Sequence, residues 1–147
     1  MSTDHDRILA WFKRRCGNWR SERRYLFSTD GQPKLFTTMM DIKQGEKETQ
    51  FDIQWEGSTS GVMAVELIGT VLHRSRDYFG DGANSSEVFL IDPDTVVTST
   101  AYGGVRYREE IRFLNQDGIA FRQTLGTKED GSFALCGQYV EFRLPYS

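Results

Sequence analysis

The chain has 147 residues, which is near the commonest size of one domain, so one hydrophobic core is expected over 1–147. Charged residues make up 27% of it and the net charge is only -3, so there is no basic field to attract nucleic acid or an anionic membrane surface. Charges between Asp4 and Arg15 interrupt any run that could act as a signal peptide, and no later stretch is long and apolar enough to span a membrane. A cytoplasmic protein is therefore expected.

The first predicted element is one short amphipathic helix over 4–16. Thr3 is a suitable N-cap, and the acidic Asp6 follows three positions later. Apolar residues then recur at helical spacing as far as Cys16, and Gly17 ends the pattern.

From residue 18 to residue 144 the apolar period changes to two, which is typical of strands. Trp19, Ser21, Arg23, Tyr25 and Phe27 share one face of the first strand. Further strands are predicted at 36–42, 50–55, 62–72, 87–91, 95–102, 105–114, 119–125 and 132–143. Most links are short and contain Asp-Gly or Gly-Gly, as hairpins do, but residues 74–86 predict a long mobile loop.

About nine or ten consecutive strands with short links predict a meander. A meander of that size removes its exposed edges most simply by closing into one antiparallel up-and-down β-barrel. The expected fold class is therefore mainly β, with a barrel over 18–144 and the N-terminal helix plugging one end.

Few residues offer metal or nucleophilic chemistry. His5 and His73 are the only histidines, and no Cys-x-x-Cys or His-Glu-x-x-His pattern occurs, so no metal site is expected. His73 is interpreted as an exposed strand-end residue and not as a haem ligand. Cys136 is interpreted as a buried core thiol and not as a nucleophile, and no disulfide between Cys16 and Cys136 is expected without an export signal.

Arginines share strand faces with aromatic residues. Arg23 lies on the face of Trp19 and Tyr25, whereas Arg20 and Arg24 lie on the opposite face. In the last two strands, parity alone leaves open whether Arg122 and Glu141 face inward or form surface ion pairs. Because an unpaired buried charge is costly, inward-facing arginines would imply an acidic ligand or an internal carboxylate.

Gly17-Asn18-Trp19, directly after the helix, is the Gly-x-Trp mark of lipocalin-type barrels. Together with Trp11-Phe12, the stretch from Gly17 to Arg23 resembles the opening of the bilin lyases of the CpcS/CpeS family. Segments 107–113, 121–124, 132–136 and 141–143 resemble that family's last three strands in order and spacing, and Trp55-Glu56-Gly57 is similar to its central motif. The chain departs from many members at Arg24-Tyr25-Leu26, where they carry a histidine pair.

The resemblance implies that the barrel binds a linear tetrapyrrole, phycocyanobilin or phycoerythrobilin, and hands it to a cysteine of an α or β apo-phycobiliprotein subunit as a thioether. The bilin would be a transferred substrate, with no tightly bound cofactor. The setting would be the cyanobacterial cytoplasm or the plastid stroma. A homodimer, or a heterodimer with a related lyase, is compatible with this activity.

The resemblance also implies residue roles. Arg23 and Arg122 match the family's pocket arginines and would clamp propionate groups. Glu141 matches its late acidic residue and would act catalytically, by hydrogen-bonding pyrrole N–H groups of the protonated bilin. The remaining predicted substrate contacts are aromatic: Trp19, Tyr25, Trp55, Phe113 and Tyr139. A non-enzymatic carrier of a pigment, haem or fatty acid is the alternative, because it would share every one of these pocket features.

Overall fold

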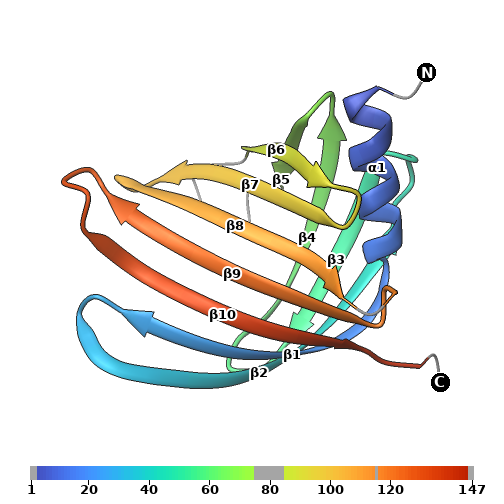
Figure 1. The fold of residues 1–147 in the computed structure, drawn as a ribbon. Coiled ribbons are helices and arrows are strands. Elements are labelled where there is room, and N and C mark those ends of the chain that lie inside the picture. The colour runs from blue at the N-terminus through green and yellow to red at the C-terminus, as the bar shows by residue number, and fades with distance from the viewer. Residues whose placement is uncertain (1–2, 75–84, 115, 146–147) are drawn as a thin grey trace.

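The strands of the computed structural model form one closed antiparallel barrel (Figure 1). The structure describes residues 3–74, 85–114 and 116–145. Within these residues the order is α1 (Asp4–Arg15), β1 (Gly17–Phe27), β2 (Asp30–Gln44), β3 (Gln50–Glu56), β4 (Ser60–Ile68), β5 (Val71–Arg74), β6 (Ser85–Asp92), β7 (Thr95–Tyr102), β8 (Val105–Leu114), β9 (Ile119–Lys128) and β10 (Phe133–Arg143). Neighbours in sequence pair in space, and β10 closes the barrel against β1. The predicted mainly β, up-and-down barrel with one N-terminal helix is confirmed.

Alternation along β1 and β10 fixes which side chains point into the barrel. On β1, Trp19 and Ser21 are buried, whereas Arg20, Glu22 and Arg24 are exposed, as predicted. The period-two pattern of β10 leaves Gly137, Tyr139 and Glu141 buried and turns Gln138 and Val140 to solvent. The orientation that parity left open is therefore settled, with Glu141 inside.

The single strand predicted over 62–72 is wrong. The chain reverses there, so that β4 and β5 form a hairpin in which Leu67 faces Leu72. Gly69 stands at the turn with φ +61°, a conformation that glycine adopts without the steric cost of a side chain. Of the long loop predicted over 74–86, Arg74 ends β5 and residues 85–86 begin β6. Residues 75–84 lie outside the described residues.

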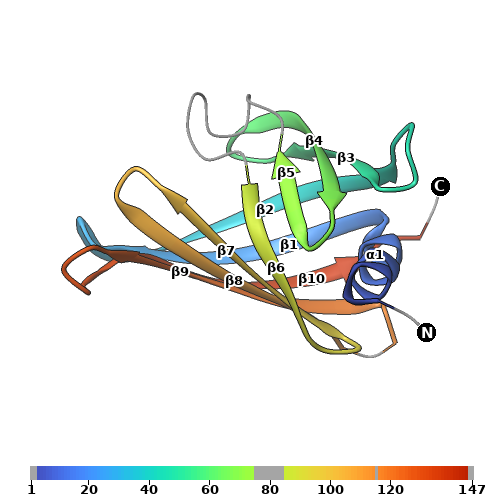
Figure 2. The same ribbon diagram turned by 90° about the horizontal axis from the view of Figure 1, so that it is seen from above.

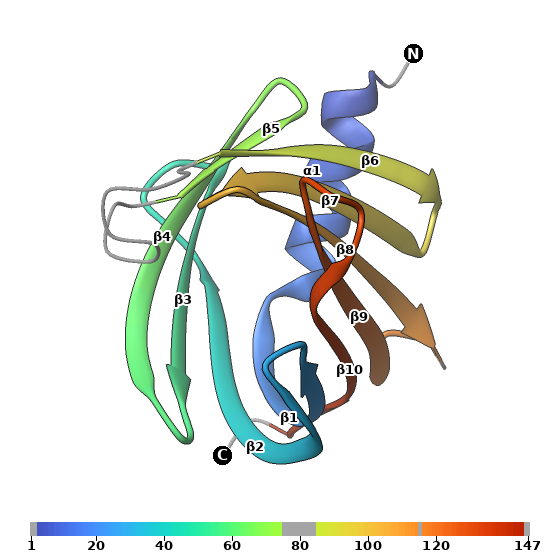
Figure 3. The ribbon, with the colours of Figure 1, turned by 90° about the vertical axis from the view of Figure 1, so that its left-hand side faces the viewer.

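Helix α1 closes one end of the barrel by binding the turns that meet there (Figures 1 and 2). His5 Nδ1 lies 2.7 Å from the carbonyl oxygen of Gly69 in the β4–β5 turn. Lys13 pairs with Glu48 between β2 and β3. Arg14 pairs with Asp94 between β6 and β7, and with Asp117 between β8 and β9. Seen from the opposite end, the strands form a ring with α1 crossing behind it (Figure 3).

The C-terminal end of α1 is held by one residue from each closing strand. Trp19 of β1 is fully buried and donates from Nε1 to the carbonyl oxygen of Arg15, at 2.9 Å. Arg143 of β10 stacks 4.3 Å from the Trp19 ring and donates to the carbonyl oxygens of Arg14 and Cys16, each at 2.6 Å. A helix leaves its last carbonyls unpaired and favours a cation nearby, so this contact stabilises the end of α1.

We expect Arg143→Ala to lower the free energy of unfolding by about 2 kcal/mol or more, because hydrogen bonds from a charged group contribute about 1.5–3 kcal/mol. Urea denaturation at neutral pH measures this difference. Arg112→Ala is the matched control, since Arg112 is exposed and pairs with Asp92 at 3.5 Å, where a change of less than about 0.5 kcal/mol is expected. Equal losses in the two variants would contradict the role of Arg143.

Candidate ligand-binding site

The barrel interior contains a cavity of about 600 Å³, a volume within the range of about 300–1,000 Å³ typical of small-molecule sites. Trp11 and Phe12 of α1 line the cavity, and Ser58 and Thr59 line it at the β3–β4 turn. Most of the wall between these regions is aromatic or aliphatic: Tyr25, Phe27, Phe36, Met40, Ile42, Phe51, Ile53, Trp55, Met63, Val65, Leu72, Val96 and Ile111. The cavity is therefore suited to a flat, largely apolar molecule.

Trp55 lies against a glycine on the neighbouring strand. Gly61 is its partner in the β3–β4 register, and a Cβ added there would lie 2.5 Å from Trp55 Cζ2. Only a residue without a side chain leaves room for the indole at this place, so the sequence of β4 helps to orient an aromatic ring of the cavity wall.

A chain of buried ion pairs crosses the inner wall. Arg15 of α1 pairs with Glu141, which also accepts from Arg122 Nη1 at 3.1 Å. Arg122 Nη2 donates to Glu109 at 2.9 Å, and the Thr124 hydroxyl donates to the same Glu109 oxygen at 2.9 Å. Four charges from α1, β8, β9 and β10 thus neutralise one another inside the barrel.

Both carboxylates of this series of ion pairs, Glu141 and Glu109, are ionised. Burial alone would raise the pKa of Glu141, but Arg15 and Arg122, with a hydrogen bond from Ser21, outweigh it and lower the pKa to about 2. For Glu109, burial also acts upward, and the charge and hydrogen bond of Arg122 again lower the pKa below its ordinary value. Glu109 lines the cavity, whereas Glu141 is fully buried behind the arginines.

Arg23 differs from Arg122 because it has no carboxylate partner among the described residues. Its Nε donates to the Ser21 hydroxyl at 3.0 Å, and its Nη1 donates to the Tyr25 hydroxyl at 3.3 Å. Its guanidinium lies 4.9 Å from the centre of the Tyr139 ring, on which Arg122 also stacks, at 5.0 Å. Arg23 lines the cavity and is half-buried, so it presents an uncompensated positive charge to whatever the cavity holds.

The structure brings four of the predicted site residues together in the cavity wall, namely Arg23, Arg122, Tyr25 and Trp55. The other four lie outside the lining: Tyr139 and Glu141 pack against the arginines, and Trp19 and Phe113 lie at the closed end. Trp19 and Phe113 are excluded from the lining because Trp11 of α1 inserts beside Phe113, with ring centres 5.2 Å apart, and fills that end of the barrel.

Three charged residues of the lining were missed, and one of them, Arg74 at the end of β5, had been predicted to begin a long loop. Glu109 shares the inward face of β8 with Ile111 and Phe113, so strand parity could have identified it. Arg15 follows Trp11 by four residues on the buried face of α1, and that spacing was the available signal.

The prediction that Cys136 is a buried core thiol is wrong. Because Gly137 and Tyr139 face inward, Cys136 lies on the outer face of β10, where it is half-buried. His73 is exposed, as predicted. Cys16 and Cys136 are both free thiols.

Over the described ranges, no group of three or more His, Cys, Asp or Glu side chains could hold a metal ion. The helix that the structure describes lacks the length and apolar character needed to cross a bilayer.

Comparisons with known proteins bear on the same features. No protein-family model matches the chain. A protein of Nostoc sp. named as the phycocyanobilin lyase CpcS 2 is 23% identical over 97% of this chain and 94% of that protein. One of Picosynechococcus sp. named as the chromophore lyase CpcV is 25% identical over 98% of this chain and 85% of that protein. The solved structure of the S-type phycobiliprotein lyase CPES from Guillardia theta shares the fold, with a TM-score of 0.77 over all of both chains and 17% identity. The resemblance to the CpcS/CpeS family is confirmed.

The ion pairs predict a specific loss of stability in acid. A carboxyl whose pKa is lowered by folding stabilises the protein above its ordinary pKa, and that contribution disappears as pH falls towards the folded value. For Glu141 this loss of stability falls between pH 4.5 and about pH 2. The pKa shift corresponds to about 3 kcal/mol of unfolding free energy.

We therefore expect Glu141→Gln to lower the free energy of unfolding by about 3 kcal/mol at pH 7, since Arg15 loses its carboxylate partner. Its stability should also fall less steeply than that of the unsubstituted protein between pH 4.5 and 2. Urea denaturation across this range measures both effects, with the exposed Glu22→Gln on β1 as control. Parallel pH profiles for the unsubstituted protein and Glu141→Gln would rule out the assigned window.

Proposed function

We propose that this protein is a phycobiliprotein chromophore lyase, which binds a linear tetrapyrrole in its barrel and transfers it to a cysteine of an apo-phycobiliprotein subunit. The sequence similarity to proteins named as lyases of this kind, along nearly the whole chain, supports the assignment. The observation that carries it is the uncompensated Arg23 in an aromatic cavity. The pigment, phycocyanobilin or phycoerythrobilin, is a transferred substrate and not a resident cofactor.

Arg23 provides the site for a propionate of the pigment. A linear tetrapyrrole is flat and largely apolar, but it carries two propionate groups, and aromatic walls with a guanidinium match both properties. The groups that accept from Arg23 now are all neutral: the Ser21 hydroxyl, the Tyr25 hydroxyl and the Met40 sulfur, which lies 3.2 Å from Arg23 Nη2. A carboxylate could therefore add charge-assisted hydrogen bonds without breaking an existing ion pair.

Glu109 is the carboxylate best placed to contact the pyrrole nitrogens, because it lines the cavity while Glu141 does not. Its lowered pKa keeps it ionised, so it accepts hydrogen bonds and stabilises a protonated bilin. Glu141 then acts indirectly, since it positions Arg122, which in turn holds Glu109. The catalytic contact that the family resemblance assigned to Glu141 is thus proposed for Glu109, the other carboxylate bound to Arg122.

The transfer step needs no nucleophile from this chain. The thiol of the acceptor adds across the exocyclic double bond of ring A: its sulfur forms the new C–S bond and its proton goes to the neighbouring carbon. Atoms and electrons balance without an oxidant or reductant. The role of this protein is to bind the pigment, keep it protonated and present ring A at the open end of the barrel, opposite α1.

The carrier alternative is less well supported for haem, since His73 is exposed and no histidine is among the residues that line the cavity. For other pigments and for fatty acids, transfer itself separates the two functions. A carrier would bind the pigment and leave the acceptor subunit uncoloured.

We expect Arg23→Ala to weaken bilin binding by tenfold to a hundredfold, because a hydrogen bond between charged groups contributes about 1.5–3 kcal/mol. Arg23→Lys should restore only part of the affinity, since lysine lacks the planar guanidinium. Titration of the visible absorbance of the bilin measures both. Arg20→Ala and Arg24→Ala are matched controls on the outer face of β1, and equal effects at all three positions would remove the main support for the proposed site.

Coexpression with bilin-making enzymes and candidate α and β subunits tests the transfer directly. We expect zinc-enhanced fluorescence on the denatured acceptor subunit and none on this chain. Cys136→Ser should keep most of the transfer activity, because Cys136 lies on the outer face and the attacking thiol belongs to the partner. Pigment that stays covalently on this chain after denaturation would contradict the mechanism.

A further inference from the structure

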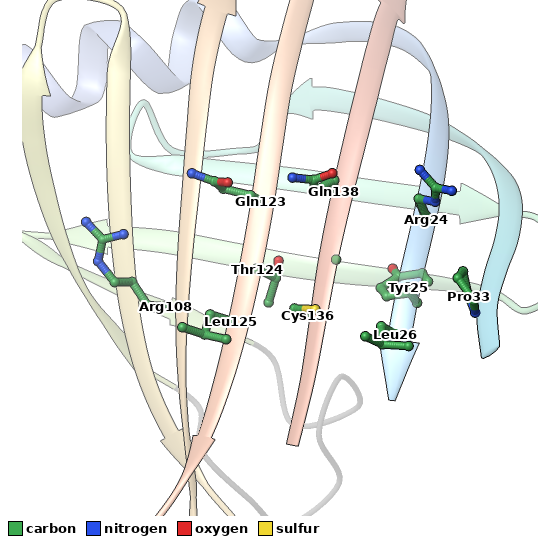
Figure 4. A pocket seen from close by; sticks show the side chains of 11 residues that line it. Arg24, Tyr25, Leu26, Pro33, Arg108, Gln123, Thr124, Leu125, Cys136 and Gln138 are labelled. Atoms are coloured by element: carbon green, nitrogen blue, oxygen red, sulfur yellow. The ribbon is translucent and has the colours of Figure 1, made fainter. Parts of the chain in front are cut away.

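A second hollow lies on the outside of the barrel, over β8, β9, β10 and β1 (Figure 4). Its volume is about 450 Å³. Its centre is an apolar row of three side chains that face one another across neighbouring strands: Leu26 of β1, Cys136 of β10 and Leu125 of β9. Leu125 is 46% exposed, and Leu35 on the adjacent β2 is 75% exposed. We call this hollow the Cys136 groove.

Two arginines border the apolar row. Arg24 and Arg108 both line the groove and are both exposed, and neither forms an ion pair with any described residue. No aspartate or glutamate belongs to the lining, although Glu110 reaches its border through a hydrogen bond from Gln123 at 2.7 Å. The groove is therefore locally positive in a chain whose net charge is -3.

Two other outward arginines of the same two strands are paired, whereas Arg106, nearer the open end of β8, donates to the Ser99 hydroxyl at 3.1 Å. Arg20 of β1 lies 3.4 Å from Glu22, and Arg112 of β8 lies 3.5 Å from Asp92. Both lie nearer the helix-covered end than Arg24 and Arg108 do. Unpaired cations thus lie on the part of this face nearer the open end, next to exposed apolar side chains. Such a surface is complementary to a partner that presents carboxylates beside an apolar residue.

The groove also lies beside the cavity. Tyr25 lines both, and Phe27, one residue beyond Leu26, lines the cavity. The apolar row lies close to the ends of β1 and β9 and the start of β10, which meet at the open end of the barrel (Figure 1). A partner seated in the groove would therefore lie next to the opening through which ring A is presented.

On the basis of the proposed function, we propose that the Cys136 groove is the docking surface for the acceptor subunit. Leu26 and Leu125 receive an apolar side chain of the subunit, and Arg24 and Arg108 bind carboxylates on either side of it. Charge reversal at the two arginines removes the complementarity and leaves the interior of the barrel unchanged.

The test is the double variant Arg24→Glu/Arg108→Glu, assayed for transfer over a range of apo-subunit concentrations. We expect the KM for the subunit to rise about tenfold or more, with kcat and the affinity for the bilin unchanged. Added salt should slow transfer by the unsubstituted protein at low subunit concentration and have little effect on the variant. Arg20→Glu/Arg112→Glu is the control, with the same change of charge on the same strands, and should behave as the unsubstituted protein does.

An unchanged KM in the Arg24/Arg108 variant would overturn the docking proposal, as would an equal rise in the control. A wild-type dimer in analytical ultracentrifugation that the charge reversal converts to monomer would also overturn it, because a second copy of this chain would then occupy the groove. Failure of the unsubstituted protein to bind bilin or to transfer it would instead overturn the proposed function, and the two failures are thus distinguishable.

Cys136 allows an independent test without changing a charge. In a Cys16→Ser background, a bulky maleimide on Cys136 should block transfer to the subunit while bilin binding persists. Cys16→Ser/Cys136→Ser treated with the same reagent should retain transfer. Full transfer by the labelled protein would contradict docking in the groove.

Discussion

The buried ion chain Arg15–Glu141–Arg122–Glu109 is the constraint on which the rest of the structure depends. Each member lies in the interior, where an unpaired charge is costly, so each needs the next one in place. These ion pairs join α1 to β10, β9 and β8, and they therefore couple closure of the barrel end to the arrangement of the inner wall. A helix docked without Arg15 in register would leave Glu141 with only one of its two cations.

The same pairing explains why one arginine of the cavity is different. Glu109 and Glu141 compensate Arg15 and Arg122, but nothing described compensates Arg23. The internal carboxylates thus fix the wall, and the Arg23 guanidinium, held by the Ser21 and Tyr25 hydroxyls, stays available for a ligand. Preorganised cations of this kind bind an anion without rearrangement of the site.

Sequence periodicity predicted most of the fold, because alternation along β1 and a capped helix are local signals. It failed at Gly69, where one glycine converts a continuous apolar run into a hairpin. The site was harder to predict, since parity divides a strand into two faces without saying which is inside. Cys136 was therefore misplaced, and Glu109 was missed although it shares a face with Ile111. Trp19 and Phe113 were assigned to the pocket because nothing in their own strands shows that Trp11 fills that end.

Because side chains alternate along a strand, β1 and β10, which close the barrel, contribute to its interior with one face and to the Cys136 groove with the other. Along β1, Tyr25 faces the cavity and Leu26 the outer groove, and along β10, Tyr139 lies inside and Cys136 outside. Between them, Gly137 has no side chain: a Cβ there would lie 2.9 Å from Tyr139 Cε1 and 3.0 Å from Tyr25 Cδ1. The tyrosines therefore pack directly beneath the backbone of β10, and the wall is thin where it separates the cavity from the groove. A pigment inside and an acceptor outside could thus be held by the same pair of strands.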